Sequence, residues 1–148
     1  MFSKSTEYAL RATIYIAQKS TEEKKTGIAE IAKAIDSPQS FTAKILQSLT
    51  KENKIICSVS GPRGGFYMTE DAKNLPVRAI LDAMGEDTIL DKCLLGMETC
   101  SENTPCPIHS RYKLIKKQLI DLFESETIGQ MTQYAKSKDV FLDNQRKK

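Results

Sequence analysis

The feature that most restricts the fold is a sharp break between two short helical segments, at Asp36-Ser37-Pro38. Before it, apolar residues at helical spacing predict a helix over residues 27–35, which the hydroxyl of Thr26 can cap. After it, the serine hydroxyl and the proline ring are typical of a helix start and predict a helix over residues 38–52. Two helices joined by a short turn form the helix-turn-helix pattern.

A Gly-rich hairpin follows this pair of helices. Residues 55–60 and 66–69 have the composition of two short strands, and Gly61-Pro62-Arg63-Gly64-Gly65 between them is typical of a tight tip. The tip lacks the Lys-Ser/Thr ending and the following helix that a nucleotide-binding P-loop needs. A helix-turn-helix followed by such a hairpin predicts a winged helix, which is a mainly α fold with a small β-hairpin wing.

Further helices are predicted on both sides of this unit. Residues 5–18 carry apolar residues at helical spacing with no Gly or Pro, which predicts a first helix. A helix that begins after Leu75-Pro76 is expected to end at Gly85, acting as a left-handed cap.

The C-terminal part of the chain predicts a long helix that forms a dimer. Its apolar positions advance by four and three residues, the spacing of helices that pair side by side. A last short helix over residues 128–135 is expected to pack back on the body. The residues of the pairing seam are Ile108, Tyr112, Ile115, Leu119 and Leu122.

Charge is unevenly distributed along the chain, whose net charge is +3. Residues 1–68 hold ten Lys/Arg and six Asp/Glu, whereas residues 69–148 hold twelve and thirteen. This excess favours a polyanionic partner for the N-terminal half. The longest apolar stretches are too short to span a bilayer, and charges near the N-terminus do not fit a signal peptide, so we expect a cytoplasmic protein.

The second helix of the pair and the wing supply the candidate contacts to double-stranded DNA. Gln, Ser and Lys side chains can hydrogen-bond to base edges or phosphates, and an arginine at a hairpin apex suits a groove or phosphate contact. A solvated helix face and a plain turn are the alternative interpretations. A dimer would read a roughly palindromic operator. The candidates are Gln39, Ser40, Phe41 and Lys44 of the helix, where Thr42 is also available, and Ser58, Ser60, Arg63 and Gly64 of the wing.

Three of the four cysteines lie within fourteen residues, at Cys93, Cys100 and Cys106, and the only histidine follows at His109. Thiolates and imidazole are ligands for iron–sulfur clusters, zinc and copper(I). The wide spacing lacks the C-x2-C pairs typical of structural zinc and suggests a larger group. A disulfide switch and unligated cysteines are the alternatives. Cys57 stands apart and is expected to be a buried structural cysteine.

No Ser/His/Asp or Cys/His catalytic set and no paired carboxylates stand out, so we expect a protein that is not an enzyme. The predicted organisation is a winged-helix DNA-binding domain over residues 1–85, a cysteine-bearing cluster-binding loop over 86–107, a dimerisation helix with a short terminal helix over 108–135, and a polar tail over 136–148.

Together these motifs resemble the Rrf2 family of bacterial regulators. The matching segments are residues 4–11, 37–41 and 61–66 and the three-cysteine loop, and the likeness runs from about residue 1 to residue 135. The resemblance implies a winged-helix homodimer that represses transcription. Its DNA affinity would be controlled by an iron–sulfur cluster that senses redox state, iron or nitric oxide.

The resemblance also implies a ligand set. Cys93, Cys100, Cys106 and His109 correspond to the ligands of a two-iron two-sulfur cluster in the assembly regulators of the family. In its nitric-oxide sensors a four-iron four-sulfur cluster takes its fourth ligand from an N-terminal acid of the partner subunit, and Glu7 occupies the matching position. The alternative function is a cluster-free repressor that responds to thiol oxidation or to a metabolite.

Overall fold

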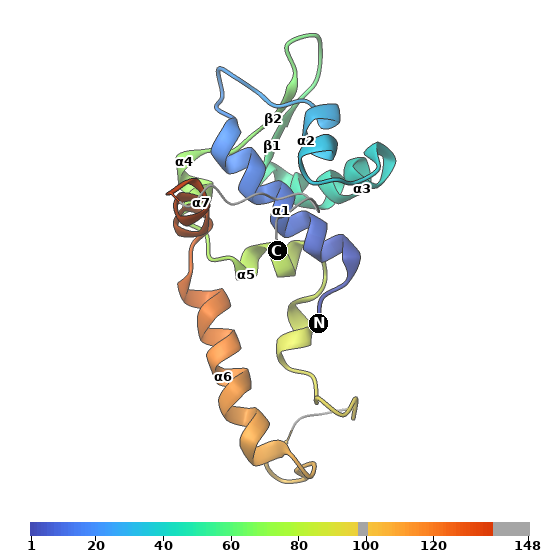
Figure 1. Ribbon diagram of the computed structural model, residues 1–148, viewed down its shortest axis with the longest axis vertical. Coiled ribbons are helices and arrows are strands. Elements are labelled where there is room, and N and C mark those ends of the chain that lie inside the picture. The colour runs from blue at the N-terminus through green and yellow to red at the C-terminus, as the bar shows by residue number, and fades with distance from the viewer. Residues whose placement is uncertain (98–100, 138–148) are drawn as a thin grey trace.

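The computed structural model describes residues 1–97 and 101–137. It is mainly helical with one antiparallel two-stranded hairpin, in agreement with the predicted fold class (Figure 1). The elements in chain order are α1 (Lys4–Lys19), α2 (Ile28–Ala34), α3 (Gln39–Leu49), the short 3-10 helix η1 (Lys51–Asn53), β1 (Cys57–Val59), β2 (Gly65–Tyr67), α4 (Glu70–Lys73), α5 (Arg78–Ala83), the 3-10 helix η2 (Asp87–Leu90), α6 (His109–Ser125) and α7 (Ile128–Ser137).

Helix α1 is the central element, and α2, α3, α5 and α7 all pack against it. Ser3 caps its N-terminus, because the serine side chain accepts a hydrogen bond from the Thr6 amide. The buried face of α1 consists mostly of small residues, which lets the neighbouring helices approach its backbone. Those buried residues are Thr6, Ala9, Ala12, Thr13, Ile16 and Ala17.

Helices α2 and α3 form the predicted helix-turn-helix, but both predicted caps are wrong. Thr26 does not cap α2, because Gly27 lies between it and the helix and occupies the cap position. The amide and the carbonyl oxygen of Thr26 each bond to Phe66 at 2.9 Å and make an isolated β-bridge. Pro38 rather than Ser37 precedes α3, and it makes no side-chain cap bond.

Helix α3 is shorter than predicted and ends at Leu49. The chain then turns through η1, where Glu52 and Asn53 have φ values of 59° and 51°. Such left-handed backbone is incompatible with continuing an α-helix. The Ile56 amide donates to the Leu49 carbonyl at 3.2 Å, which brings the chain back over α3.

The wing is a short hairpin in which Cys57 pairs with Tyr67 and Val59 with Gly65. The strands are shorter than the predicted runs because Ile56 turns into the core before the hairpin begins. At the tip, the Gly64 amide donates to the Gly61 carbonyl at 2.9 Å. A side chain on Gly64 would overlap the Val59 carbonyl oxygen, so this position requires glycine.

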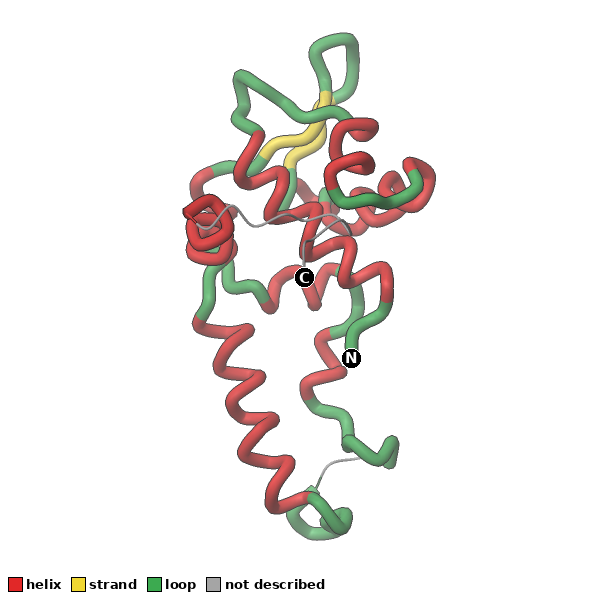
Figure 2. The backbone as a smooth tube through the Cα atoms, viewed as in Figure 1, coloured by secondary structure: helices red, strands yellow, loops and turns green. Residues whose placement is uncertain are grey.

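The chain beyond the wing builds two arms and a returning helix. Figure 2 shows α6 and the segment that follows α5 extending from the body on the side away from the wing. Gly85 ends α5 with a φ of 71°, as predicted. Arg78 of α5 donates to Glu124 of α6 at 2.7 Å and joins the long helix to the body. Helix α7 packs against α1 as predicted, with Ile128 fully buried.

Two details of the C-terminal half differ from the prediction. Helix α4 was not predicted, although Thr69 caps it by accepting from the Ala72 amide at 3.1 Å. The first two residues of the predicted tail over 136–148 belong to α7, and the rest of that tail lies outside the described residues.

Replacing Gly64 by alanine is expected to displace the wing tip, because the added carbon overlaps the backbone around Val59. The expected cost is about 1–3 kcal/mol of unfolding free energy. Amide chemical shifts should change in the wing and not in α1. The matched control is Gly27→Ala, since nothing lies within 4 Å of a side chain there. Unchanged wing shifts in the Gly64 variant would contradict this account.

Candidate functional site

The start of α3 presents polar side chains to solvent. Gln39, Ser40 and Lys44 are exposed, as a helix that contacts an external partner requires. Thr42 is not available, contrary to the prediction. It is fully buried, and its hydroxyl donates to the Pro38 carbonyl at 3.0 Å.

Phe41 differs from its neighbours because its ring is half-buried against α1. It meets the ring of Tyr8 edge to face, with the centroids 5.5 Å apart and the planes at 79°. The guanidinium of Arg11 lies 4.5 Å from the centre of the Tyr8 ring on the same helix. Phe41 therefore positions the first turn of α3 relative to α1.

The wing presents a second exposed surface. Ser58, Ser60 and Arg63 are exposed, and Gly64 is half-buried in the turn. The wing and the helix-turn-helix together occupy the end of the molecule opposite the two arms (Figure 1). Exposed cations lie on both parts, at Lys44 and Arg63, so this end suits a polyanion.

Cys57 is half-buried on β1, so the prediction of a buried cysteine is only partly right. Its thiol donates to the Asn53 carbonyl at 3.8 Å. A hydrogen bond between Cys57 and the facing Tyr67 raises the pKa of the tyrosine. These contacts hold the base of the wing.

Cys93 and Cys106 come together from the two arms, although thirteen positions separate them in the sequence. Cys93 is buried and Cys106 is half-buried. Backbone amides of Leu95 and Met97 donate to the Cys93 sulfur and lower the pKa of that thiol. Burial opposes this effect, while the Cys106 thiol and the charge of Lys116 reinforce it. The surroundings therefore favour a thiolate at Cys93.

His109 begins α6 directly after this pair. Its amide donates to the Cys106 carbonyl at 3.0 Å, and its Nε2 atom is buried. Glu7, the alternative fourth ligand, is exposed on the first turn of α1. Cys100 lies outside the described residues. Within residues 1–97 and 101–137, no three His, Cys, Asp or Glu side chains gather closely enough to hold a metal ion.

The donor chemistry of this site fits a thiophilic metal group. Metal binding by cysteine needs the thiolate, which the amides of Leu95 and Met97 favour at Cys93. A second sulfur is in contact, and an imidazole with a buried nitrogen follows within one turn. Sequence spacing predicted the cysteines but missed the two amide donors, which carry no side-chain signal.

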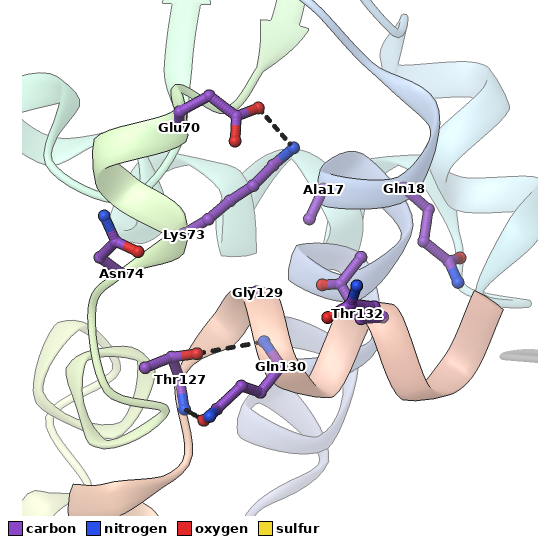
Figure 3. A pocket seen from close by; sticks show the side chains of 10 residues that line it. Ala17, Gln18, Glu70, Lys73, Asn74, Thr127, Gly129, Gln130 and Thr132 are labelled. Atoms are coloured by element: carbon purple, nitrogen blue, oxygen red, sulfur yellow. Dashed lines mark hydrogen bonds and ion pairs between the residues drawn. The ribbon is translucent and has the colours of Figure 1, made fainter. Parts of the chain in front are cut away.

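A polar pocket of about 550 Å³ lies among α1, α4 and α7, away from every predicted site residue (Figure 3). Glu70 and Lys73 form an ion pair of 3.1 Å in its wall. The Thr127 amide donates to the Gln130 side chain at 2.9 Å, and the Gln130 amide donates back to the Thr127 hydroxyl at 3.1 Å. These bonds pair Glu70 with Lys73 and Thr127 with Gln130 within the wall.

Comparison with known proteins decides the family. A family model described as Rrf2, an iron-dependent transcriptional regulator, matches residues 2–134. The chain belongs to the Rrf2 family. This confirms the resemblance drawn from the sequence motifs.

Individual relatives agree with the Rrf2 assignment. An Aquifex aeolicus protein named as an HTH-type transcriptional regulator is 33% identical over 130 residues, which cover 86% of this chain and 88% of that protein. CymR of B. subtilis, titled a global cysteine regulator, matches in fold with a TM-score of 0.73 at 16% identity, covering 90% of this chain and 97% of its own. T. potens IscR matches in fold with a TM-score of 0.69 at 18% identity, covering 95% of this chain and 91% of its own.

These findings make the chain a DNA-binding transcriptional regulator with the Rrf2 winged-helix fold. The names of the family and of these relatives are those of regulators rather than enzymes. In the part of the chain that the structure describes, no helix has the length and apolar character needed to cross a bilayer.

Proposed function

We propose that this regulator is a cytoplasmic homodimeric repressor whose affinity for a roughly palindromic operator is controlled by an iron–sulfur cluster. The observation that carries the proposal is the contact between Cys93 and Cys106, which joins the ends of the two arms. The description of the Rrf2 family as iron-dependent supports the choice of iron.

The proposed ligands are Cys93, Cys100, Cys106 and His109, with Glu7 of the partner subunit as the alternative to the histidine. A two-iron two-sulfur cluster is favoured, because His109 lies three residues after Cys106 and its amide donates to the Cys106 carbonyl. A four-iron four-sulfur cluster is the alternative through Glu7, which is exposed. When bound, the cluster would supply a centre that responds to redox state, iron supply or nitric oxide.

The residues of the chain itself support such a site in two ways. The Leu95 and Met97 amides donate to the Cys93 sulfur and lower the pKa of its thiol. Lys116 on α6 places a cation near that charge, which offsets part of the negative charge of a thiolate-ligated cluster. Loss of the contacts that Cys93 makes with Cys106 and Lys116 would release Cys93 from the arm that carries α6.

Some of the proposed residues would contact DNA directly, and others would position those that do. Gln39, Ser40 and Lys44 would reach base edges or phosphates from α3, since they are exposed at its start. Phe41 would fix the orientation of that turn through Tyr8. On the wing, Ser58, Ser60 and Arg63 would contact the DNA backbone or a groove, with Gly64 shaping the tip.

The proposed dimer forms through α6. Large apolar side chains remain exposed along it: Leu114 is 67% exposed, and Ile115 and Leu122 are each 54% exposed. Leu119 instead packs against the core of the same chain, so only part of the predicted seam is available to a partner. We propose the predicted division into residues 1–85, 86–107 and 108–135 as the working parts of each subunit.

A cluster-free thiol switch is the second candidate. With a peroxide or diamide as the oxidant, the Cys93 thiolate, favoured by its lowered pKa, would attack the oxidant, and the Cys106 thiol would then displace the reduced oxidant to form the disulfide. The reduced oxidant carries away the two electrons and two protons lost by the two thiols. CymR, which shares the fold, is titled a cysteine regulator. This mechanism would bind DNA without iron.

Anaerobically prepared protein is expected to be coloured and to contain iron and acid-labile sulfide in equal amounts. Cys106→Ser should abolish the visible absorption, because it removes a proposed ligand. Cys57→Ser is the matched control, since Cys57 lies on the wing, and it should keep the colour. A colourless protein free of iron, whose DNA affinity changes with diamide, would overturn the cluster in favour of the thiol switch.

Arg63→Ala is expected to weaken binding to all DNA sequences by a similar factor, because the side chain would contact phosphates. The slope of log affinity against log salt should fall by about 1. Lys117→Ala on α6 is the control, because it removes a cation far from the wing. A loss of affinity for one operator sequence only, at unchanged salt slope, would assign Arg63 to base reading instead.

Ile115→Glu is expected to separate the dimer, because it places a charge in the exposed apolar stripe of α6. The dimer dissociation constant, measured by sedimentation, should rise by at least about 30-fold. Lys117→Glu is the control, since it lies roughly 200° further around the same helix. A dimer that is equally stable in both variants would exclude α6 as the interface.

A further inference from the structure

The carboxylate of Glu86 lies at the beginning of α1. The Ser3 amide donates to its two oxygens at 3.2 and 3.3 Å. The Thr6 hydroxyl donates to Oε1 at 2.7 Å, and the Ser3 hydroxyl bonds to the same oxygen. A helix start has unpaired amides and a positive partial charge, so it favours an ionised carboxylate.

The hydrogen bonds to Glu86 favour the ionised form of its carboxyl group. Burial opposes ionisation of Glu86, but the hydrogen bonds from Ser3 and Thr6 outweigh it and lower the pKa of the carboxyl, with Lys92 adding to the effect. Thr6 is fully buried, which shields its bond to the carboxylate from water. Glu86 therefore holds the first turn of α1 from outside that helix.

A second contact reaches the same turn from α6. The ring of Phe2 meets the ring of Phe123 edge to face, with the centroids 5.5 Å apart and the planes at 84°. Phe123 is the buried residue of α6. The start of α1 is thus held by a polar contact from one arm and an apolar contact from the other.

The same two arms carry the cysteines. Glu86 follows Gly85 at the end of α5, and η2 then leads to Cys93. On the other arm, Cys106 and His109 precede and begin the helix that carries Phe123. Leu90 of η2 is buried in the core, so the segment that runs from Glu86 to Cys93 is held against the body.

The beginning of α1 is also connected to α3, which carries residues proposed to contact DNA. Tyr8 lies two residues after Thr6 on α1, and its ring contacts Phe41 in the first turn of α3. Phe41 is flanked by the exposed Ser40 and followed by the exposed Lys44. A shift of α1 along or about its axis would therefore move the residues proposed to read DNA.

We propose that the first turn of α1 transmits the state of the cysteine site to α3, and that Glu86 is the positioning residue that makes this connection. The inference rests on the proposed function, since it explains how that site alters DNA affinity. Because packed side chains repack between discrete arrangements, a displaced carboxylate would move Tyr8 and Phe41 together.

The test uses the full chain and the substitution Glu86→Gln. Glutamine keeps the length of the side chain but removes its charge and replaces one acceptor oxygen by a donor nitrogen. Glu23→Gln is the matched control, because Glu23 is exposed in the loop after α1 and loses the same charge. Thr6→Val removes the hydroxyl that donates to Glu86, keeps the Ser3 cap of α1, and serves as the second variant if Glu86→Gln does not fold.

The first measurement is amide hydrogen exchange in the protein without metal. In Glu86→Gln, exchange should accelerate at least about threefold both at residues 6–9 of α1 and at residues 42–46 of α3. In Glu23→Gln both segments should exchange as in the wild type. Acceleration confined to α1 would overturn the proposal, because the first turn would then not be coupled to α3.

The second measurement is the ratio of operator affinities between metal-loaded and metal-free protein. Glu86→Gln should lower this ratio at least about fivefold while leaving the visible spectrum unchanged. A wild-type ratio in this variant would overturn the role of Glu86. Equal affinities of the two wild-type forms would overturn the proposed function instead, and the exchange result would still decide whether α1 is coupled to α3.

Discussion

The packing of helices around α1 is the interaction on which the rest of the structure depends. Its buried face is made mostly of alanine and threonine, so the neighbouring helices come close to its backbone. Thr13 satisfies its hydroxyl within the helix by donating to the Ala9 carbonyl at 2.8 Å, which leaves no unpaired polar group at that point of the interface. Through α1, helix α3, the returning helix α7 and the two arms share one core.

Much of this fold could be predicted from local chemistry. The break at Asp36-Ser37-Pro38, the glycines of the wing and the cap at Gly85 each act within a few residues, and the structure places them as expected. The errors arose where a distant partner decided the outcome. Thr26 bonds to Phe66, forty positions away, instead of capping a helix, and Thr42 turns inward rather than toward solvent.

The candidate sites show the same contrast between features set by the local sequence and features set by distant partners. Spacing together with the family resemblance indicated that Cys93 and Cys106 belong to one site, and the structure brings them into contact. The amide donors of Leu95 and Met97 could not be predicted, because any residue supplies a backbone amide and only the loop conformation directs it. The role of Glu86 could likewise not be predicted, since its partners Ser3 and Thr6 lie 83 and 80 positions away in the sequence.

The β-bridge between Thr26 and Phe66 has a consequence for how the wing and the helix-turn-helix can move. It joins the base of the wing to the start of α2 by two backbone bonds, which remain after any substitution that keeps the amide hydrogen, so proline alone removes one of them. Because the two bonds use the backbone groups of both residues, the base of the wing and the residues just before α2 move together at this point. A partner that displaces the base of the wing therefore also displaces the start of α2.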